Sequence, residues 1–398
     1  MNKYTIDGIS IDSVELKCLL VSRGVKVDNA VYKHYKTSRL SKNPLCCNCC
    51  LLSDGTIAQL TDTGFHLNYL SGILSWDNLK LLKYMGDLGT PFSLRMQGSD
   101  AVLFYNDKAV DTVTFPPASS FYKQKTDAGR SFVGNSVLQG LDWVAFQCLW
   151  PCEYAAAGQP CQFCFSGGDF ENAAKKGKHL PAAVPADDVF EIVQYALQHD
   201  GIKHMQITGG STYDGRTESK NIIAYLEKFK ENALNLPGEI LLYITPPADT
   251  AILDTYFELG ASRIACSLEV WDLARARAIT PGKMNITSRD RHLQALTRIA
   301  NKYGAARAFS NFIIGVEEFD TLAKGATWLG ERGVLPTASV WMPMGRPVMG
   351  SMKAPDIDYY KRVKEHFAEL YVRCGLEPTV SRGLNVCIER DIWEYATR

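Results

Sequence analysis

Strand-like and helix-like segments alternate strictly along most of the chain, from about residue 135 onward. Each short run rich in β-branched and aromatic residues is followed by a longer segment with apolar residues at helical spacing. The strand runs lie at 141–150, 202–210, 238–247, 262–271, 306–317 and 336–343, and the helical segments at 185–201, 219–234, 248–261, 288–304, 319–333 and 354–375. Such alternation predicts a parallel sheet with right-handed crossovers and helices outside it.

The number of these units limits the architecture further. There are six strand–helix pairs, whereas a complete TIM barrel has eight. We therefore predict an α/β fold with a partial (β/α)6 TIM-like barrel, open along one side. Folds of this kind place their chemistry at the C-terminal ends of the strands.

The first 134 residues have a different pattern. Segments 55–67 and 91–117 alternate apolar and polar residues around turn formers, which is typical of antiparallel strands. We predict a small N-terminal α+β accessory domain with β-strands over 1–134, a barrel core over 135–354, and a C-terminal helix and tail over 355–398 that packs on the barrel.

Charge and hydropathy exclude several classes of function. Lys plus Arg (43) balance Asp plus Glu (43), so electrostatics favours neither nucleic acid nor an anionic membrane as a partner. The N-terminus lacks the apolar core of a signal peptide, and no apolar run of about 18 residues could span a bilayer. We expect a cytoplasmic protein, in which clustered members of its 12 cysteines act as metal ligands or catalytic thiols.

Three cysteines follow the first barrel strand directly: Cys152, Cys161 and Cys164. Thiols at this density favour soft metals, either zinc or an iron–sulfur cluster. A structural zinc site needs four protein ligands, whereas three cysteines at the mouth of a barrel suit a cluster with one iron left open. Cys148 is an alternative first ligand, but it lies within the strand, and we favour Cys152 because it lies in the loop.

At these residues the sequence resembles the radical S-adenosylmethionine (radical SAM) superfamily. Cys161-Gln162-Phe163-Cys164 matches the C-x-aromatic-C ending of the family's cysteine triplet. The resemblance implies that Cys152, Cys161 and Cys164 hold a 4Fe–4S cluster, that SAM chelates its open iron, and that Phe163 contacts the SAM adenine. The family has three residues between its first two cysteines and this chain has eight. The Ala- and Gly-rich spacer could loop out while the thiols converge.

Three later stretches extend the resemblance, each at the end of a predicted strand. They match the family's GGE motif, its polar SAM contacts on the fourth strand, and its GxIxGxxE pattern, in which Asn311 replaces the first glycine. The implied SAM-binding residues are Gly209, Gly210, Ser211, Ser267, Glu269, Ile313 and Gly315. Taken singly, each has an ordinary structural interpretation: a turn, a solvated charge or barrel packing.

Family membership implies a reaction class and partners. The enzyme would reductively cleave SAM to a 5′-deoxyadenosyl radical, with electrons from a donor such as flavodoxin or ferredoxin, and abstract hydrogen from a small molecule. Basic residues near three strand ends, Arg216, Lys283 and Arg346, would fit an anionic substrate. Each of them could equally be a solvated surface charge. Neither nucleic acid nor a membrane is expected as a partner.

Two alternatives stay open. The same cysteines could form a non-catalytic zinc- or iron–sulfur-binding site with a structural or electron-transfer role. A second cluster, Cys46, Cys47, Cys49 and Cys50, could bind another metal, completed by Cys374 and Cys387, or could be four reduced thiols in a turn.

Overall fold

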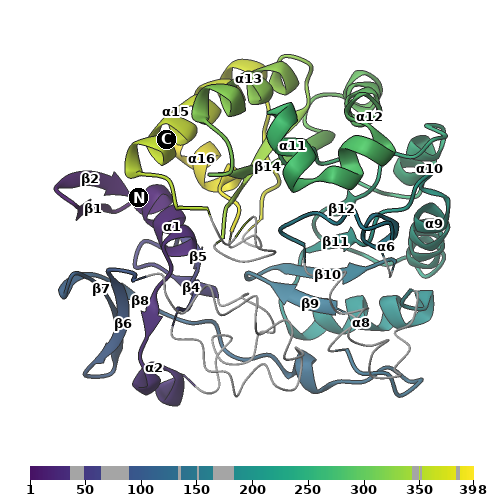
Figure 1. Ribbon diagram of the computed structural model, residues 1–398. Helices are drawn as coiled ribbons and strands as arrows, with labels where there is room; N and C mark the ends of the chain where they lie inside the picture. Colours follow the sequence, from purple (N-terminus) through teal and green to yellow (C-terminus); the bar gives the residue numbers. More distant parts are fainter. Residues whose placement is uncertain are drawn as a thin grey trace.

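A computed structural model of the protein describes residues 1–35, 49–63, 89–132, 136–149, 152–164, 183–342, 349, 352–381 and 386–398. Its centre is a seven-stranded sheet in the order β15-β14-β13-β12-β11-β10-β9 (Figure 1). Six of these strands are parallel to one another, which confirms the predicted partial barrel. They are β10 (Trp143–Gln147), β11 (His204–Thr208), β12 (Ile240–Tyr243), β13 (Arg263–Ala265), β14 (Ala308–Ile314) and β15 (Leu335–Val340). The seventh strand, β9 (Ser136–Gln139), pairs antiparallel with β10 at the edge of the sheet.

Helices cover the outer side of the sheet in the predicted order (Figure 1). Their apolar stripes pack on outward-facing strand residues. One such contact joins Phe146 of β10 and Tyr225 of α9 (Arg216–Glu231), whose rings meet edge to face. The six predicted helices are α8 (Ala186–His199), α9 (Arg216–Glu231), α10 (Ile252–Glu258), α12 (Arg289–Tyr303), α13 (Phe319–Gly330) and α15 (Ile357–Cys374). Shorter elements that the periodicity did not predict are α6 (Glu153–Ala156), α11 (Leu273–Ile279), a π-helical turn η2 (Lys283–Thr287) and α16 (Glu389–Ala396).

The N-terminal region contains the predicted antiparallel strands. β6 (Phe92–Gln97), β7 (Asp100–Tyr105) and β8 (Lys108–Val113) form a meander, and the short β3 (Lys26–Val27) joins it at one edge. Two further pairs are β1 (Lys3–Ile6) with β2 (Ile9–Asp12) and β4 (Cys49–Leu51) with β5 (Ile57–Gln59). The described part of this region also contains two short helical segments, α2 (Asn29–His34) and the 3₁₀ turn η1 (Ser120–Lys123).

Helix α1 (Ser13–Ser22) escaped the sequence analysis. All ten of its residues are buried, its polar Glu15 and Lys17 included, so it has no solvent-exposed face and no regular alternation of apolar and polar sides. The Asp12 side chain caps it and, together with Glu15, forms ion pairs with Lys364 of α15. Buried residues of the N-terminal region and the barrel belong to one apolar core, and the domain boundaries at 134 and 354 stay a prediction.

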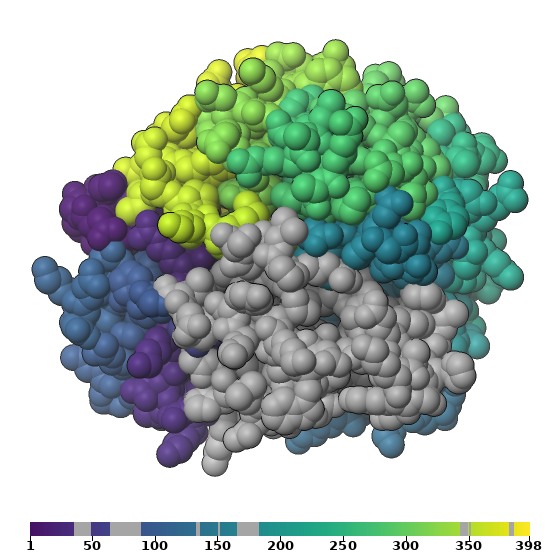
Figure 2. Space-filling model, viewed as in Figure 1, coloured from purple at the N-terminus to yellow at the C-terminus, as the bar shows by residue number. Residues whose placement is uncertain are grey.

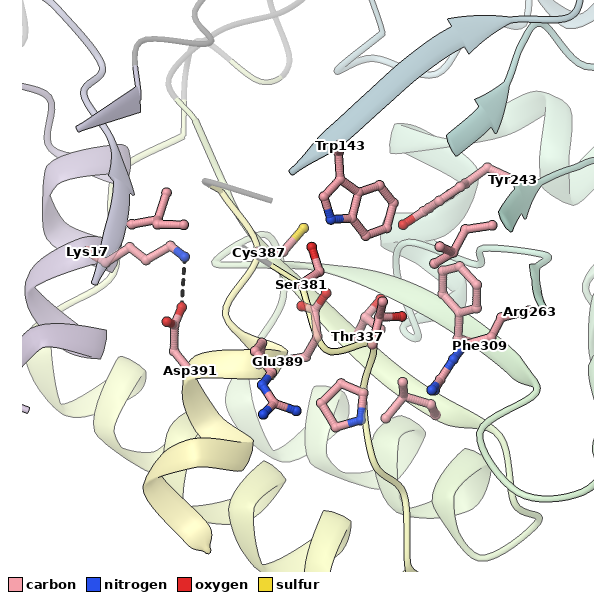
Figure 3. Close-up of a pocket in the computed structure, with 16 residues that line it drawn as sticks. Lys17, Trp143, Tyr243, Arg263, Phe309, Thr337, Ser381, Cys387, Glu389 and Asp391 are labelled. Atoms are coloured by element: carbon pink, nitrogen blue, oxygen red, sulfur yellow. Dashed lines mark hydrogen bonds and ion pairs between the residues drawn. The ribbon is translucent and has the colours of Figure 1, made fainter. Parts of the chain in front are cut away.

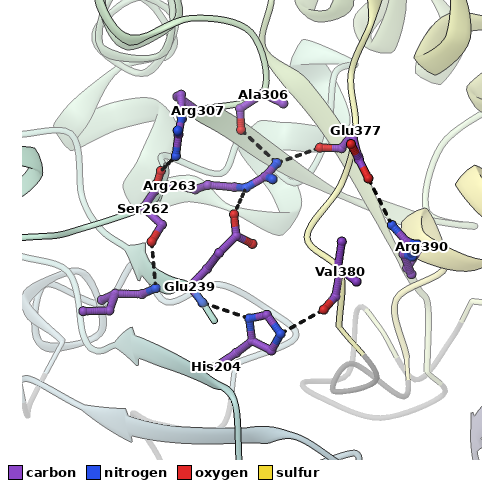
Figure 4. Close-up of polar contacts among 10 residues, drawn as sticks. His204, Glu239, Ser262, Arg263, Ala306, Arg307, Glu377, Val380 and Arg390 are labelled. Carbon is purple, nitrogen blue, oxygen red and sulfur yellow. Dashed lines mark hydrogen bonds and ion pairs between the residues drawn. The ribbon is translucent and has the colours of Figure 1, made fainter. Parts of the chain in front are cut away.

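The C-terminal tail lies against the starts of the strands. His204 Nε2 lies 2.9 Å from the carbonyl oxygen of Val380, and Arg263 donates to the carbonyl of Glu377 over 2.7 Å (Figure 4). In the space-filling view, the N-terminal residues (purple) adjoin the C-terminal part (yellow) at the surface (Figure 2). The tail therefore covers the end of the sheet at which the strands begin, opposite the cysteine loop.

Candidate active site at the C-terminal strand ends

The cysteine loop begins where β10 ends. Cys152 is the N-cap of α6, so the long spacer between the first two cysteines winds into a helical turn rather than looping out freely. The backbone amide of Gln162 donates to Ile279 over 2.8 Å, and the side chain of Asn285 donates to that of Gln159 over 2.9 Å. The loop is thus fastened to the segment around α11 and η2.

The three predicted ligand thiols are half-buried, whereas Cys148 is fully buried in the strand end. Burial raises the pKa of Cys161 to about 12, Lys283 opposes the rise, and Cys164, Glu269 and Cys152 add to it. Cys161 therefore lies within electrostatic reach of both other thiols. In the described parts of the chain, no three metal-binding side chains stand at coordination distance. As a donor set, three thiols in one loop fit an iron–sulfur cluster.

The glycine pair after β11 holds the cysteine loop in place. A Cβ on Gly210 would lie 2.8 Å from the backbone of Cys152, and one on Gly209 would lie 3.0 Å from Cys148 Sγ. The amide of Ser211 donates to Cys152 Sγ over 3.4 Å, and its carbonyl accepts from Glu153 over 2.8 Å. These glycines thus permit close backbone contact with the loop itself, and their contact with SAM stays a prediction.

A buried ion pair stands beside the loop. Lys283 Nζ donates to Glu269 Oε1 over 2.9 Å and to the carbonyl of Ser267 over 2.7 Å. The two charged side chains are only 14% and 11% exposed. Burial alone would lower the pKa of Lys283, but Glu269, with Cys161 and Cys164, outweighs it and leaves the pKa raised. Lys283 is therefore a cation fixed close to the thiols.

Asn311 organises this pair from the neighbouring strand. Its side-chain amide donates to Glu269 Oε2 over 2.8 Å, and its oxygen accepts from Ser339 over 2.8 Å. Glu269 has a φ of 69°, a value that non-glycine residues rarely adopt. Backbone bonds to Asn311 and Ile313, 2.9 and 3.0 Å long, hold it there. Local strain of this kind, stabilised by the surrounding structure, is typical of functional positions.

An apolar cluster closes the other side of the predicted site. Phe163 packs against buried residues that include Ile313, Trp341 and Ile279. The sequence predicts that both Phe163 and Ile313 contact SAM, and the fold brings both into one cluster. Gly315, with a φ of 102°, lies beneath α15, where a Cβ would meet Pro355 at 3.1 Å.

The three basic candidates do not converge. Lys283 belongs to the site, but Arg216 is 86% exposed and pairs with Asp214 over 3.2 Å. Arg346 lies outside the described residues. The two described residues thus offer no shared anion-binding pocket.

The second cysteine cluster is described only in part, since Cys46 and Cys47 lie outside the described residues. Cys49 and Cys50 are adjacent in β4 and fully buried. Burial raises the pKa of the Cys50 thiol well above its usual range. Cys387, proposed to complete the set, lies in the barrel interior, where its thiol is 3.1 Å from Ser339 Oγ. Over the ranges that the structure describes, no second metal site is visible.

Glu218 of α9 is a buried acid that the sequence analysis missed. It is 2% exposed and accepts hydrogen bonds from the amide of Thr245 at 3.1 and 3.4 Å. Burial raises its pKa to about 8; the Thr245 bonds oppose this and Glu153 adds to it. It occupies a polar position on an amphipathic helix, so no sequence signal distinguished it from a surface residue.

Comparisons with known proteins return distant similarities, and no family model matches the chain. A curated relative, Bacteriochlorophyllide c C-7(1)-hydroxylase of Chlorobaculum limnaeum, is 23% identical over 298 residues, or 71% of this chain and 73% of the relative. A solved radical SAM methyltransferase from Sphaerobacter thermophilus shows 14% identity and a TM-score of 0.43, covering 82% of this chain and 91% of that one. Methylornithine synthase shows 15% identity and a TM-score of 0.41, covering 58% of this chain and 63% of that one.

The proteins to which this chain is similar thus include a radical SAM methyltransferase and a hydroxylase. None of these similarities assigns a substrate or a cluster ligand to this chain, so the ligand set stays a prediction. Within the described residues, no helix is long and apolar enough to cross a membrane.

Proposed function

We propose that this protein is a radical SAM enzyme that holds a 4Fe–4S cluster on Cys152, Cys161 and Cys164 and activates a carbon–hydrogen bond of a small molecule. The observation that carries the proposal is the loop of half-exposed thiols at the C-terminal strand ends, flanked by a buried Lys283–Glu269 pair. A structural metal site has no need of a buried ion pair beside its ligands, or of the strained backbone of Glu269 in that pair.

The residues divide the work by their chemistry. When bound, the cluster and SAM supply a 5′-deoxyadenosyl radical, which is the oxidising group. Lys283 places a positive charge beside thiols that must ionise to bind metal, which favours their ligating form. Asn311 fixes the orientation of the Glu269 carboxylate, which can accept hydrogen bonds from polar or cationic groups. The cluster around Phe163 offers an apolar wall for a planar ring.

The relative's name supports the carbon–hydrogen target, because a hydroxylase acts at such a bond. The substrate class stays broad. Lys283 is committed to Glu269, and Arg216 lies at the surface, so an anionic substrate would depend on Arg346. If Lys283→Ala and Arg346→Ala both leave substrate affinity unchanged, an anionic group on the substrate is ruled out.

Electron paramagnetic resonance tests the proposal. We expect the anaerobically reconstituted, reduced protein to show a 4Fe–4S signal that changes shape when SAM is added. The Cys152/Cys161/Cys164 triple alanine variant should lose this signal and about four irons per chain. Cys374→Ser, a half-buried cysteine at the end of α15, is the matched control and should keep both.

The alternative function predicts different results. A signal that is indifferent to SAM would indicate an electron-transfer cluster. Stoichiometric zinc without iron would indicate a structural site. Either result would refute the proposal. Iron remaining in the triple variant, with a zinc assay alongside, would point to the second cysteine cluster.

A further inference from the structure

A cavity opens inside the barrel beside the C-terminal tail. Its walls come from residues near the starts of several strands, among them Trp143, Leu241 and Phe309, from Tyr243 at the end of β12, and from the tail (Figure 3). Its empty space, open solvent at the mouth included, is about 550 Å³. None of the residues assigned above to the cluster or to SAM lines it.

Charged side chains line this cavity, and most of them are already paired. Lys17 Nζ lies 2.7 Å from Asp391, and Arg263 Nε lies 2.8 Å from Glu239. Arg390 contacts Glu394 at 3.2 Å and Glu377 at 3.6 Å. These pairs neutralise the cations, so none of them leaves a positive charge to attract an anion.

Glu389 differs from these groups. It is only 9% exposed, and its Oε2 has no hydrogen-bond partner among the residues that the structure describes. A buried carboxylate oxygen without a donor is costly. Burial accordingly raises the pKa of Glu389 to about 7, and backbone hydrogen bonds and the charge of Lys17 oppose the rise. In Figure 3, Glu389 lies with Cys387 and Ser381 on the tail side of the cavity, across from the strands.

The facing wall is aromatic. Trp143 is fully buried, and its Nε1 has no acceptor among the described side chains and backbone. Tyr243 and Phe309 meet edge to face with ring centroids 5.0 Å apart. Aromatic faces attract organic cations, and Glu389, with one carboxyl oxygen unbonded, would supply the counter-charge.

We propose that this cavity binds a small organic amine, with its ammonium on Glu389 and its apolar body against Trp143, Tyr243 and Phe309. The unpaired indole N–H of Trp143 would favour an amine that also carries an oxygen acceptor. None of the residues assigned to the cluster or to SAM lines the cavity, so the proposal stands apart from the proposed function. A failure of one leaves the other intact.

Calorimetric titration of the full-length protein with benzylamine tests the site, with benzyl alcohol as the uncharged analogue. We expect benzylamine to bind and benzyl alcohol to bind at least tenfold more weakly. Glu389→Gln keeps the shape of the side chain and should weaken benzylamine roughly ten- to a hundredfold, as expected for a charged hydrogen bond. Glu369→Gln, at an exposed position of α15, should leave binding unchanged.

Trp143→Phe provides a second probe, since it keeps the aromatic wall and removes the indole N–H. It should leave benzylamine affinity within about threefold and weaken an amino alcohol such as 2-amino-1-phenylethanol more strongly. Equal binding of benzylamine and benzyl alcohol, or unchanged affinity in Glu389→Gln, would overturn the proposal. So would the absence of benzylamine binding at millimolar concentration.

Discussion

Glu218 makes the stability of this protein depend on pH in an unusual direction. Its ordinary pKa is 4.5, and burial beneath the strand ends raises it to about 8 in the folded chain. Between these values the carboxyl is protonated when folded and ionised when unfolded. The stabilisation is fully present below pH 4.5 and is lost as the pH rises through about 8.

The magnitude follows from the distance between pH and pKa. pH 7 lies about 2.5 units above the ordinary pKa of the carboxyl, and each unit corresponds to about 1.4 kcal/mol. About 3.5 kcal/mol of this stabilisation is therefore lost at pH 7. Glu218→Gln removes the titration and keeps an oxygen that can accept from Thr245. The free energy of unfolding of this variant, minus that of the wild type, should therefore rise with pH by about 1.4 kcal/mol per unit between pH 5 and pH 8.

Urea unfolding of the metal-free protein at each pH measures this difference. Glu227→Gln, the same change at an exposed position of α9, should show no such rise. Infrared spectroscopy gives an independent reading, because a protonated carboxyl band present at pH 7 should vanish in Glu218→Gln. A pH-independent difference, together with no lost band, would show that Glu218 is ionised in the folded protein and would refute the reasoning.

Two further predictions concern the site. Lys283→Met leaves Glu269 buried without its cation and should lower the free energy of unfolding in urea by roughly 3–5 kcal/mol. Adding Glu269→Gln should recover most of this loss. Additive effects of the two substitutions would contradict the ion pair. Gly210→Ala would press a Cβ against the Cys152 backbone, so iron bound after reconstitution should fall severalfold. Gly238→Ala is the control: its Cβ would be equally crowded, 2.6 Å from the His204 ring, but it lies at the other end of the strands. It should lower stability and leave the iron per folded chain unchanged. Equal iron in both variants would contradict the role of Gly210.

Local patterns predicted the barrel well because the pattern that identifies each strand or helix lies within a few consecutive residues. The six parallel strands and their six helices appear in the predicted order, since alternation and helical spacing are properties of contiguous sequence. The same reasoning failed for α1, because all ten of its residues are buried and the helix has no solvent-exposed face. It also missed β9, an edge strand that joins antiparallel to a sheet otherwise built by crossovers.

The candidate site was predicted in part. The position of Cys152, Cys161 and Cys164 after the first strand, and the common location of Phe163 and Ile313, follow from strand ends meeting at one edge of a parallel sheet. Pairing of charges does not follow from such rules. Lys283 was assigned to a substrate because nothing local links it to Glu269.

The sequence by itself determined the order of the elements, the edge of the sheet that carries the thiols, and the residue types available there. Only the tertiary structure decided that Asn311 clamps Glu269, that the glycine pair supports the cysteine loop, and that the tail brings Glu389 to the base of the barrel. The reason is physical: periodicity and turn chemistry act between neighbours in the chain. Burial, by contrast, selects partners from distant segments, and the cost of an unpaired buried charge then fixes which groups meet.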